Sequence, residues 1–319
     1  MRIAFVGKGG SGKTTLATLF ALYEATQKPA VLIDADINMH SVQLLNLALP
    51  EDQHLSYPAN EKRIKEYLIG DNKRIASTGH FKKTTPPAEG SNLIRFSSPD
   101  GMGILKRYAA HRDNLTALTL GTYTSEGIGA SCYHNNLAVV ENILSHTVND
   151  GTTIIVDMVA GTDAFSNSLH AQFDALVFVV EPTKRSISIL EQYHKLAVAA
   201  GVGDSMLVVA NKVIDEEDEE FIKAHLPDVA YVGALHVSRH LTKVDQGRAQ
   251  LNVAELEEEN RTVLEQIAQQ LPRMKVTSQE RLRRLHQLHK VYSDQEYIKA
   301  RVGDLTSQIQ PDFTYEQHA

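Results

Sequence analysis

The chain has 319 residues, a formal net charge of −7 and 22% charged side chains, which is the composition of a globular protein. The negative balance excludes a protein that binds nucleic acid through its overall charge, although a local basic patch stays compatible with it. The single cysteine excludes an intramolecular disulfide, and no apolar run reaches the 18 residues of a membrane span. Since no charged leader precedes the first apolar run, we expect a cytoplasmic protein.

Short apolar runs rich in β-branched residues alternate with helical patterns along most of the chain. The runs are continuous and do not alternate with polar residues, as in strands that are buried on both faces of a parallel sheet. They cover residues 2–6, 30–34, 114–120, 153–157, 175–180, 206–210 and 229–235. This alternation predicts a doubly wound, mostly parallel α/β sheet with helices on both faces.

Two stretches depart from this rhythm. Residues 51–113 are polar and include the turn-forming segment TTPPAEGS, so we expect an insertion or a long excursion from the sheet. After Pro272 the composition changes to a charged helical pattern. We therefore divide the chain into an α/β domain over residues 1–272 and a helical C-terminal extension over residues 273–319.

The segment GKGGSGKTT joins the first predicted strand to the first predicted helix. Its Gly7, Gly12, Lys13 and Thr14 satisfy G-x-x-x-x-G-K-[ST] in the strand–loop–helix setting that this motif requires. The glycines let backbone N–H groups surround phosphate oxygens, Lys13 is expected to bind the β- and γ-phosphates, and the Thr14 hydroxyl to ligate Mg²⁺. The residues expected to hold the nucleotide in this loop are Gly9, Gly10, Ser11, Gly12, Lys13, Thr14 and Thr15.

Acidic residues follow two other predicted strands. The segment IIVD is a hydrophobic strand that ends in an aspartate, the Walker B arrangement, and it predicts that Asp157 holds Mg²⁺ through the water shell of the ion. The segment VLIDADIN places Asp34 and Asp36 at the carboxyl end of another strand, where the ligands of open α/β sheets bind. The sequence thus predicts one site at the carboxyl edge of the sheet.

The ordinary phosphate-loop pattern does not specify the lysine at position 8. With Lys8, the segment KGGSGKTT resembles the deviant Walker A loop, K-G-G-x-G-K-T-T, of the MinD, ParA and nitrogenase-iron-protein class of ATPases. Three phrases, DMVAGTDAF, VVEPTKRSI and GIGASCYHNN, resemble more specifically the CooC-type branch, whose members are nickel-inserting ATPases that mature carbon monoxide dehydrogenase. This resemblance covers residues 1 to about 250.

The resemblance implies roles for residues throughout the site. It implies that Lys8 reaches across a dimer interface to the nucleotide of the other subunit, so that catalysis by Lys8, Lys13 and Asp36 depends on assembly. It also implies that Asp36 begins switch I and positions the attacking water, and that the amide of Gly161 senses the γ-phosphate. Asn211 matches the adenine-reading asparagine of the class. The guanine-reading pattern N-K-x-D is broken after Lys212, which favours ATP over GTP.

The chain departs from the CooC branch at the Cys-x-Cys pair, where it has Cys132, Tyr133 and His134. Two subunits would together offer two cysteines and two histidines, a ligand set suited to Zn²⁺ or Ni²⁺ at the dimer interface. The alternative is a small buried cysteine beside a surface histidine. With one cysteine missing, nickel insertion and a related maturation or regulatory role both stay open.

The segment QERLRRLHQLHKVY of the extension repeats an apolar residue every three positions among arginines and a lysine. A basic amphipathic helix of this kind packs on the domain or a partner, binds an anionic membrane, or binds DNA, and we favour packing. Overall we expect a slow Mg²⁺-dependent ATP hydrolase that forms an ATP-dependent homodimer and helps to mature or load a client metalloenzyme. The alternative is a positioning or partition ATPase of the ParA and MinD type that binds DNA or membrane.

Overall fold

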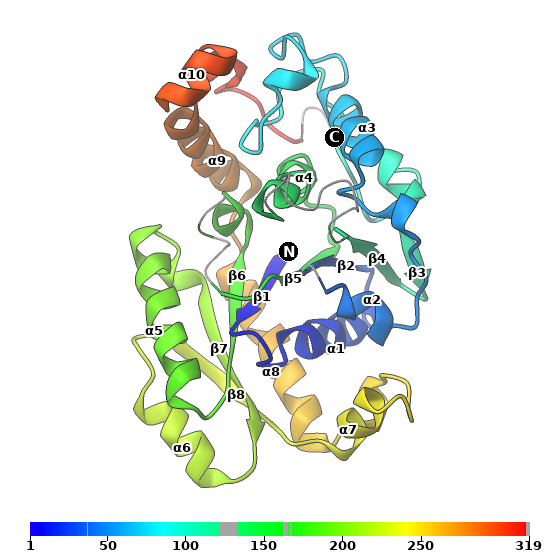
Figure 1. Ribbon diagram of the computed structural model, residues 1–319, viewed down its shortest axis with the longest axis vertical. Helices are drawn as coiled ribbons and strands as arrows, with labels where there is room; N and C mark the ends of the chain where they lie inside the picture. Colours follow the sequence, from blue (N-terminus) through cyan, green and yellow to red (C-terminus); the bar gives the residue numbers. More distant parts are fainter. Residues whose placement is uncertain (37, 122–132, 162–164, 166–167, 317–319) are drawn as a thin grey trace.

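The structure is a computed structural model that describes residues 1–36, 38–121, 133–161, 165 and 168–316. Within these residues, eight strands form one sheet in the order β3-β4-β2-β5-β1-β6-β7-β8 (Figure 1). All neighbouring strands are parallel except β3 and β4, which are antiparallel at one edge. The strands are β1 Arg2–Gly7, β2 Ala30–Ala35, β3 Ala110–Arg112, β4 Leu115–Thr119, β5 Thr153–Met158, β6 Ala175–Val180, β7 Met206–Val213 and β8 Ala230–His236. The predicted mostly parallel sheet is confirmed.

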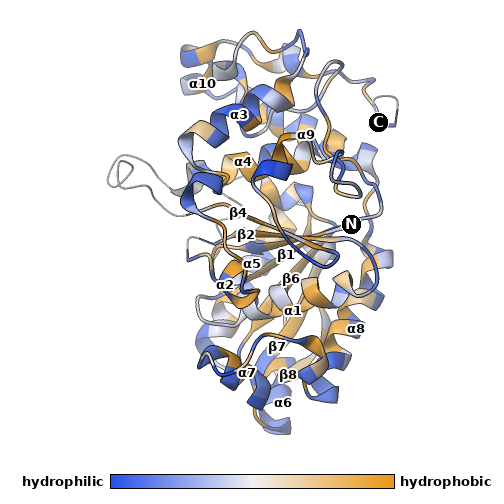
Figure 2. Ribbon diagram, turned by 90° about the vertical axis from the view of Figure 1, so that its right-hand side faces the viewer, coloured by the Kyte–Doolittle hydropathy of each residue, from blue (hydrophilic) through white to orange (hydrophobic). Residues whose placement is uncertain are grey.

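Helices cover both faces of this sheet (Figure 1). Helices α1 and α8 pack on one face, and helices α4, α5 and α6 pack on the other. The helices are α1 Lys13–Ala25, α2 His40–Leu44, α3 Pro58–Ile69, α4 Tyr133–Ser145, α5 Lys184–Ala199, α6 Glu216–Ala224, α7 Arg239–Asp245, α8 Glu258–Met274, α9 Ser278–Ser293 and α10 Glu296–Val302. Figure 2 shows the strands largely in orange, between helices that carry both orange and blue residues.

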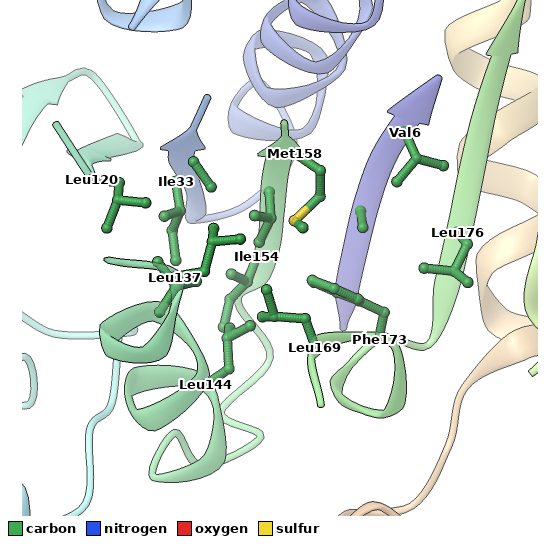
Figure 3. Packing of buried hydrophobic residues seen from close by; sticks show 14 of the residues in the cluster. Val6, Ile33, Leu120, Leu137, Leu144, Ile154, Met158, Leu169, Phe173 and Leu176 are labelled. Carbon is green, nitrogen blue, oxygen red and sulfur yellow. The ribbon is translucent and has the colours of Figure 1, made fainter. Parts of the chain in front are cut away.

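The apolar strands are buried on both sides because successive side chains point to opposite faces of the sheet. In β2, Val31 and Ile33 join the core beneath α4, whereas Leu32 joins the core beneath α1. Figure 3 shows Leu137 of α4 near Ile33 of β2, and Leu144 farther along the same helix, nearer to Ile154 of β5. A strand with two apolar faces is stable only between two layers, so the continuous apolar runs explain the three-layer arrangement.

Residues 51–113, expected to leave the sheet, both cover it and return to it. The stretch contains α3, and although its composition is polar, its apolar side chains are buried in the core on the α4 side. Its last residues, Ala110–Arg112, form the edge strand β3, so the expectation of an excursion fails at this end. A tight turn with Asp113 at a φ of 53° allows β3 to pair antiparallel with β4.

The C-terminal residues begin inside a helix, because α8 continues to Met274 and Pro272 stands in its last turn. The change of composition at residue 272 is therefore not a break in the backbone structure. Beyond it, α9 packs its apolar stripe onto the protein, with Leu282 and Leu285 each about 1% exposed. These leucines meet Leu93 of the 51–113 stretch, so the two departures from the α/β pattern lie together.

This packing accounts for the amphipathic pattern of the extension. The apolar stripe of α9 meets its own chain along most of the helix, although Val291 at its end is 65% exposed. None of the helices in the described part of the chain is long and apolar enough to span a bilayer. The favoured alternative, packing on the domain, is the one that the structure contains.

Candidate functional site

The glycine-rich loop lies between the end of β1 at Gly7 and the start of α1 at Lys13. Gly12 precedes the helix with a φ of 88°, and a Cβ atom there would collide with the amide of Asn211, so only glycine fits. The Ser11 N–H donates to the Lys8 carbonyl oxygen at 3.1 Å and closes the turn. The loop therefore presents its backbone at the N-terminus of a 13-residue helix, a setting that attracts anions.

Lys13 lies at the base of this loop and pairs with Asp36, which follows β2. Their Nζ and Oδ2 atoms are 2.7 Å apart, and each side chain is only 7% exposed. The backbone and side chain of Asn38 donate to the other carboxylate oxygen at 3.0 and 2.9 Å. Burial alone would raise the pKa of Asp36, but the hydrogen bonds from Lys13 and Asn38 outweigh it and lower that pKa. The Asp36 carboxyl is thus ionised at neutral pH.

Asp34 and Asp157 face each other across two neighbouring strands. The parallel pairing of β2 with β5 sets these residues opposite each other, and both are fully buried. Burial, reinforced by the charge of Asp157, raises the pKa of Asp34 to about 8. Burial also raises the pKa of Asp157 to about 6, against the opposing effect of the Lys13 ammonium. A cation beside these two buried carboxyl groups would favour their ionised forms.

Ser41 of α2 connects these two acids, and the sequence analysis did not single it out. Its N–H donates to Asp34 at 2.9 Å, and its hydroxyl donates to Asp157 at 3.0 Å. Ser41 stands seven residues after Asp34 in no recognised motif, so only the fold could reveal it. The serine thus bridges the two carboxyl groups.

A magnesium ion fits the oxygen atoms present here. Asp157 Oδ1 is buried and accepts no hydrogen bond from any residue that the structure describes. The Thr14 hydroxyl lies beside this carboxyl group and lowers its pKa, in the same direction as Lys13. A carboxylate and a hydroxyl are hard oxygen ligands of the kind that Mg²⁺ binds, with water completing the shell.

Lys8 lies at the rim of the loop and pairs with Glu181, which directly follows β6. Lys8 Nζ is 3.2 Å from one carboxylate oxygen of Glu181, and Lys212 Nζ is 2.7 Å from the other. Lys212 also donates to the Gly10 carbonyl oxygen at 2.5 Å. The sequence analysis quoted Glu181 within VVEPTKRSI but gave it no role. An acidic residue directly after a buried strand was the available signal.

Asn211 lies at the end of β7 against the loop, where its side-chain amide donates to the Ser11 carbonyl oxygen at 2.7 Å. It also lines a hollow of about 220 Å³ beside Gly12 and Thr15, between the loop and α7. A second hollow of about 920 Å³ shares Thr15 and lies between α2 and the segment that follows α7. The residues from β8, α7 and the turn between them that line the smaller hollow are Leu235, His236, Val237, Ser238, Leu241, Thr242 and Asp245.

Gly161 follows β5 with a φ of 92°, and its N–H donates to the Gly7 carbonyl oxygen at 3.1 Å. This places the predicted γ-phosphate sensor next to the phosphate loop. Cys132 lies outside the described residues, and His134 stands in α4 with a side chain that is likewise outside them. The predicted inter-subunit metal ligands therefore stay a prediction.

No family model matches the chain. Among curated proteins, an uncharacterized ATP-binding protein of Methanocaldococcus jannaschii is 26% identical over 263 residues, which cover 81% of this chain and 96% of that protein. The carbon monoxide dehydrogenase accessory protein CooC of Rhodospirillum rubrum is 24% identical over 250 residues, which cover 77% of this chain and 87% of CooC. The branch expected from the sequence is thus among the relatives.

Solved structures decide the fold. A ParA family ATPase from Chlorobium tepidum matches with a TM-score of 0.54 and 16% identity, covering 83% of this chain and 96% of that one. The cell division ATPase MinD of Pyrococcus furiosus matches with a TM-score of 0.53 and 17% identity, covering 86% and 99%. The fold is that of the ParA and MinD P-loop ATPases. The resemblance inferred from the deviant loop is therefore confirmed.

Proposed function

We propose that this protein is a Mg²⁺-dependent ATPase whose hydrolysis is coupled to the formation of a homodimer. The observation that carries the proposal is the meeting of Lys13, Asp36 and Asp157 at one buried spot beside the glycine loop. These three groups come from the N-terminus of α1 and from the ends of β2 and β5. A phosphate-binding cation, an ionised acid and a metal-binding acid are the set that phosphoryl transfer to water needs.

The contacts of these residues indicate how each would act. Thr14 and Asp157 would hold Mg²⁺, which when bound neutralises charge on the phosphate oxygens. Lys13 would exchange the Asp36 carboxylate for phosphate oxygens, because both are anionic acceptors of its ammonium protons. Asp36, whose lowered pKa keeps it ionised, would then accept a hydrogen bond from the attacking water and orient it.

The base of the nucleotide would occupy the hollow beside Asn211. The hollow of about 220 Å³ has room for a planar purine. Thr15 lines this hollow, so the hollow lies next to the phosphate loop. The Asn211 side chain carries both donors and an acceptor, as pairing with the edge of adenine requires. Curated relatives described as ATP-binding proteins support the same choice of nucleotide.

Assembly would complete the site through Lys8. The lysine stands at the rim of the loop and its side chain is 25% exposed, so a partner subunit has access to it. A cation supplied in this way stabilises the charge that develops on the transferred phosphoryl group. Hydrolysis would therefore be slow in a lone protomer and faster in the dimer or with a partner.

For the biological role, we favour assistance in the maturation or metal loading of a client metalloenzyme. The similarity to CooC supports this role, and the buried apolar stripe of α9 removes the main argument for membrane attachment. A metal site built from Cys132 and His134 of two subunits would belong to it. The test is the amount of Zn²⁺ or Ni²⁺ per dimer, which is expected to fall in Cys132→Ser and whose constancy would exclude the site.

The ATPase proposal is tested with Lys8→Ala. The variant is expected to bind ATP within about threefold of the wild type, because Lys13 and the loop backbone are intact. Its turnover is expected to fall by about 100-fold or more, since one stabilising donor of this kind accounts for 10²–10³ in rate. A fluorescent ATP analogue measures nucleotide binding, and phosphate release with ATP and Mg²⁺ measures turnover. Normal turnover in Lys8→Ala would overturn the shared active site.

A further inference from the structure

Glu181 pairs with Lys8 at the rim of the phosphate loop. Its carboxylate accepts hydrogen bonds from Lys8 at 3.2 Å and from Lys212 at 2.7 Å, and its side chain is 12% exposed. It is the acid that pairs with Lys8 within the described part of the chain. The two lysines are far apart in sequence, and both pair with this carboxylate.

The position of Glu181 is fixed by the start of α5. The Glu181 N–H donates to the Ser186 hydroxyl at 3.0 Å, and the Glu181 carbonyl accepts the Thr183 N–H at 2.7 Å. Thr183 in turn caps α5 by accepting the Ser186 N–H with its hydroxyl. These bonds fix the backbone of Glu181 at the N-terminus of α5.

Lys212 keeps Glu181 paired when Lys8 leaves this carboxylate. Burial alone would raise the pKa of Glu181, but the hydrogen bonds from Lys212 and Lys8 lower it, so the carboxylate stays charged. When Lys8 leaves, Lys212 still pairs with this charge and stays bonded to the Gly10 carbonyl oxygen. An acid with two cationic partners can lose one without becoming an isolated partly buried charge.

We propose that Glu181 is a positioning residue that holds Lys8 against its own chain in the lone protomer. Lys8 then exchanges Glu181 for the nucleotide phosphates of the partner subunit when the dimer forms, while Lys212 keeps the carboxylate paired. This inference rests on the proposed role of Lys8 in the dimer. Glu181 and Lys212 would together set the protein concentration at which the ATP-bound dimer forms.

Glu181→Gln tests the inference. In sedimentation with Mg²⁺ and a non-hydrolysable ATP analogue, the dimer dissociation constant is expected to fall by about two- to thirtyfold. The range follows from two partly exposed ion pairs per dimer, each worth about 0.2–1 kcal/mol. The protein concentration for half-maximal turnover falls by the same factor, while turnover at saturating protein stays within about twofold.

Lys212→Met is the companion variant, and it is expected to change the dimer dissociation constant in the opposite direction. Lys8 becomes the remaining partner of Glu181, so the dimer dissociation constant is expected to rise above that of the wild type. Glu219→Gln, which removes an acid paired with Lys223 on α6, serves as the matched control and is expected to change neither quantity. Opposite shifts in the two variants are something that a purely structural role of Glu181 does not produce.

The outcomes separate this inference from the proposed function. If Lys8→Ala abolishes dimer formation but Glu181→Gln leaves the dissociation constant unchanged, Glu181 does not hold Lys8 and the ATPase proposal stands. Weakening of the dimer in both Glu181→Gln and Lys212→Met also overturns the inference. A loss of nucleotide affinity in Glu181→Gln, measured with a fluorescent ATP analogue, would assign Glu181 to the nucleotide site instead. Normal dimers and turnover in Lys8→Ala would overturn both proposals.

Discussion

The carboxyl edge of the sheet and the cap on the α4 side of the molecule both bury polar side chains, but they pair them differently. At the carboxyl edge, charges meet charges, as in the pair of Lys13 with Asp36. The cap, which we define as residues 51–109 together with residues 278–316, uses neutral hydrogen bonds. There His289 contacts the Thr84 hydroxyl and the Leu305 carbonyl, and the Gln308 amide donates to a backbone carbonyl.

The difference indicates which part of the molecule can exchange the partners of its buried polar groups. An ion pair can exchange one partner for a phosphate or a metal ion of the same sign, so the edge residues keep their charges satisfied in two arrangements. A side chain bonded to the backbone of its own chain has no such substitute, because unmaking the bond leaves a buried group unpaired. The cap therefore fixes one shape, and the carboxyl edge accommodates a ligand.

One buried ion pair joins the cap to the sheet and stands outside this contrast. Asp174 precedes β6 and accepts hydrogen bonds from Arg281 of α9 at 2.6 Å and from the Arg2 N–H at 2.7 Å. Burial, together with the charge of Arg281, lowers the pKa of Arg2 to about 9. Although it is ionic, this pair has no access to a ligand, and its role is to attach α9 to the sheet.

The largest effect is expected from Lys13→Ala, which breaks the ion pair that marks the carboxyl edge. Nucleotide affinity is expected to fall by about 100-fold or more, because charged hydrogen bonds to phosphate are lost. The free energy of unfolding is expected to fall by about 3–5 kcal/mol, because Asp36 stays buried without its partner. Titration calorimetry and urea unfolding measure the two effects.

The double variant Lys13→Ala with Asp36→Asn separates those effects. Removal of the orphaned charge should restore most of the stability, whereas nucleotide binding should stay lost. A double variant no more stable than Lys13→Ala would show that the pair does not carry the stability of this edge.

Arg281→Met breaks the ion pair between the cap and the sheet. It is expected to lower the free energy of unfolding by about 3–5 kcal/mol, since Asp174 stays buried and charged. Nucleotide affinity should stay within about threefold, because Arg281 and Asp174 lie beside the start of β1, whereas the phosphate loop follows the end of that strand. Arg284→Met, which breaks the more exposed pair with Glu280, is the control and should cost about 0.5 kcal/mol or less. Equal costs in both variants would contradict the argument from burial.

A pH-dependent effect is expected from Glu141 of α4. Burial raises the pKa of this carboxyl to about 8, although Lys83 acts in the opposite direction. The folded state therefore binds a proton that the unfolded state releases near pH 4.5, so stability falls as pH rises from about 4.5 to 8. The slope is at most about 1.4 kcal/mol per pH unit.

Glu141→Gln keeps an acceptor for the Ser168 N–H, which bonds to Glu141 at 2.7 Å, and removes the ionisable group. Urea unfolding at a series of pH values between 4.5 and 8 should show a flatter profile for this variant than for the wild type. Identical profiles would mean that Glu141 does not titrate in this range.

The smallest effect is expected from Tyr315→Phe in the cap. The Tyr315 hydroxyl donates to the Ser145 carbonyl oxygen at 2.6 Å in a buried contact. Loss of one neutral hydrogen bond should cost about 1 kcal/mol, with no effect on nucleotide binding or on dimer formation. Thermal unfolding measures the loss of stability, and sedimentation measures dimer formation. A change in dimer formation would mean that the cap is not merely structural.

Most of the sheet and the chemistry of the loop could be predicted from the sequence. The continuous apolar runs predicted buried parallel strands because only a strand between two layers tolerates apolar side chains on both faces. The motif around Lys13 and the acid after the β5 run predicted a phosphate and magnesium site, because parallel strands bring their carboxyl ends to one edge. The meeting of Lys13 with Asp36 follows from the same topology.

The sequence by itself determined the fold class, the phosphate loop and the presence of a second loop lysine. The tertiary structure alone decided that Ser41 joins two acids, that Glu181 pairs with Lys8, and that residues 51–109 and 278–316 form one cap. The physical reason is the same in each case. Periodicity and motifs record contacts between residues that are close in the chain, whereas Lys8 and Glu181 are 173 positions apart and leave no local pattern when they meet.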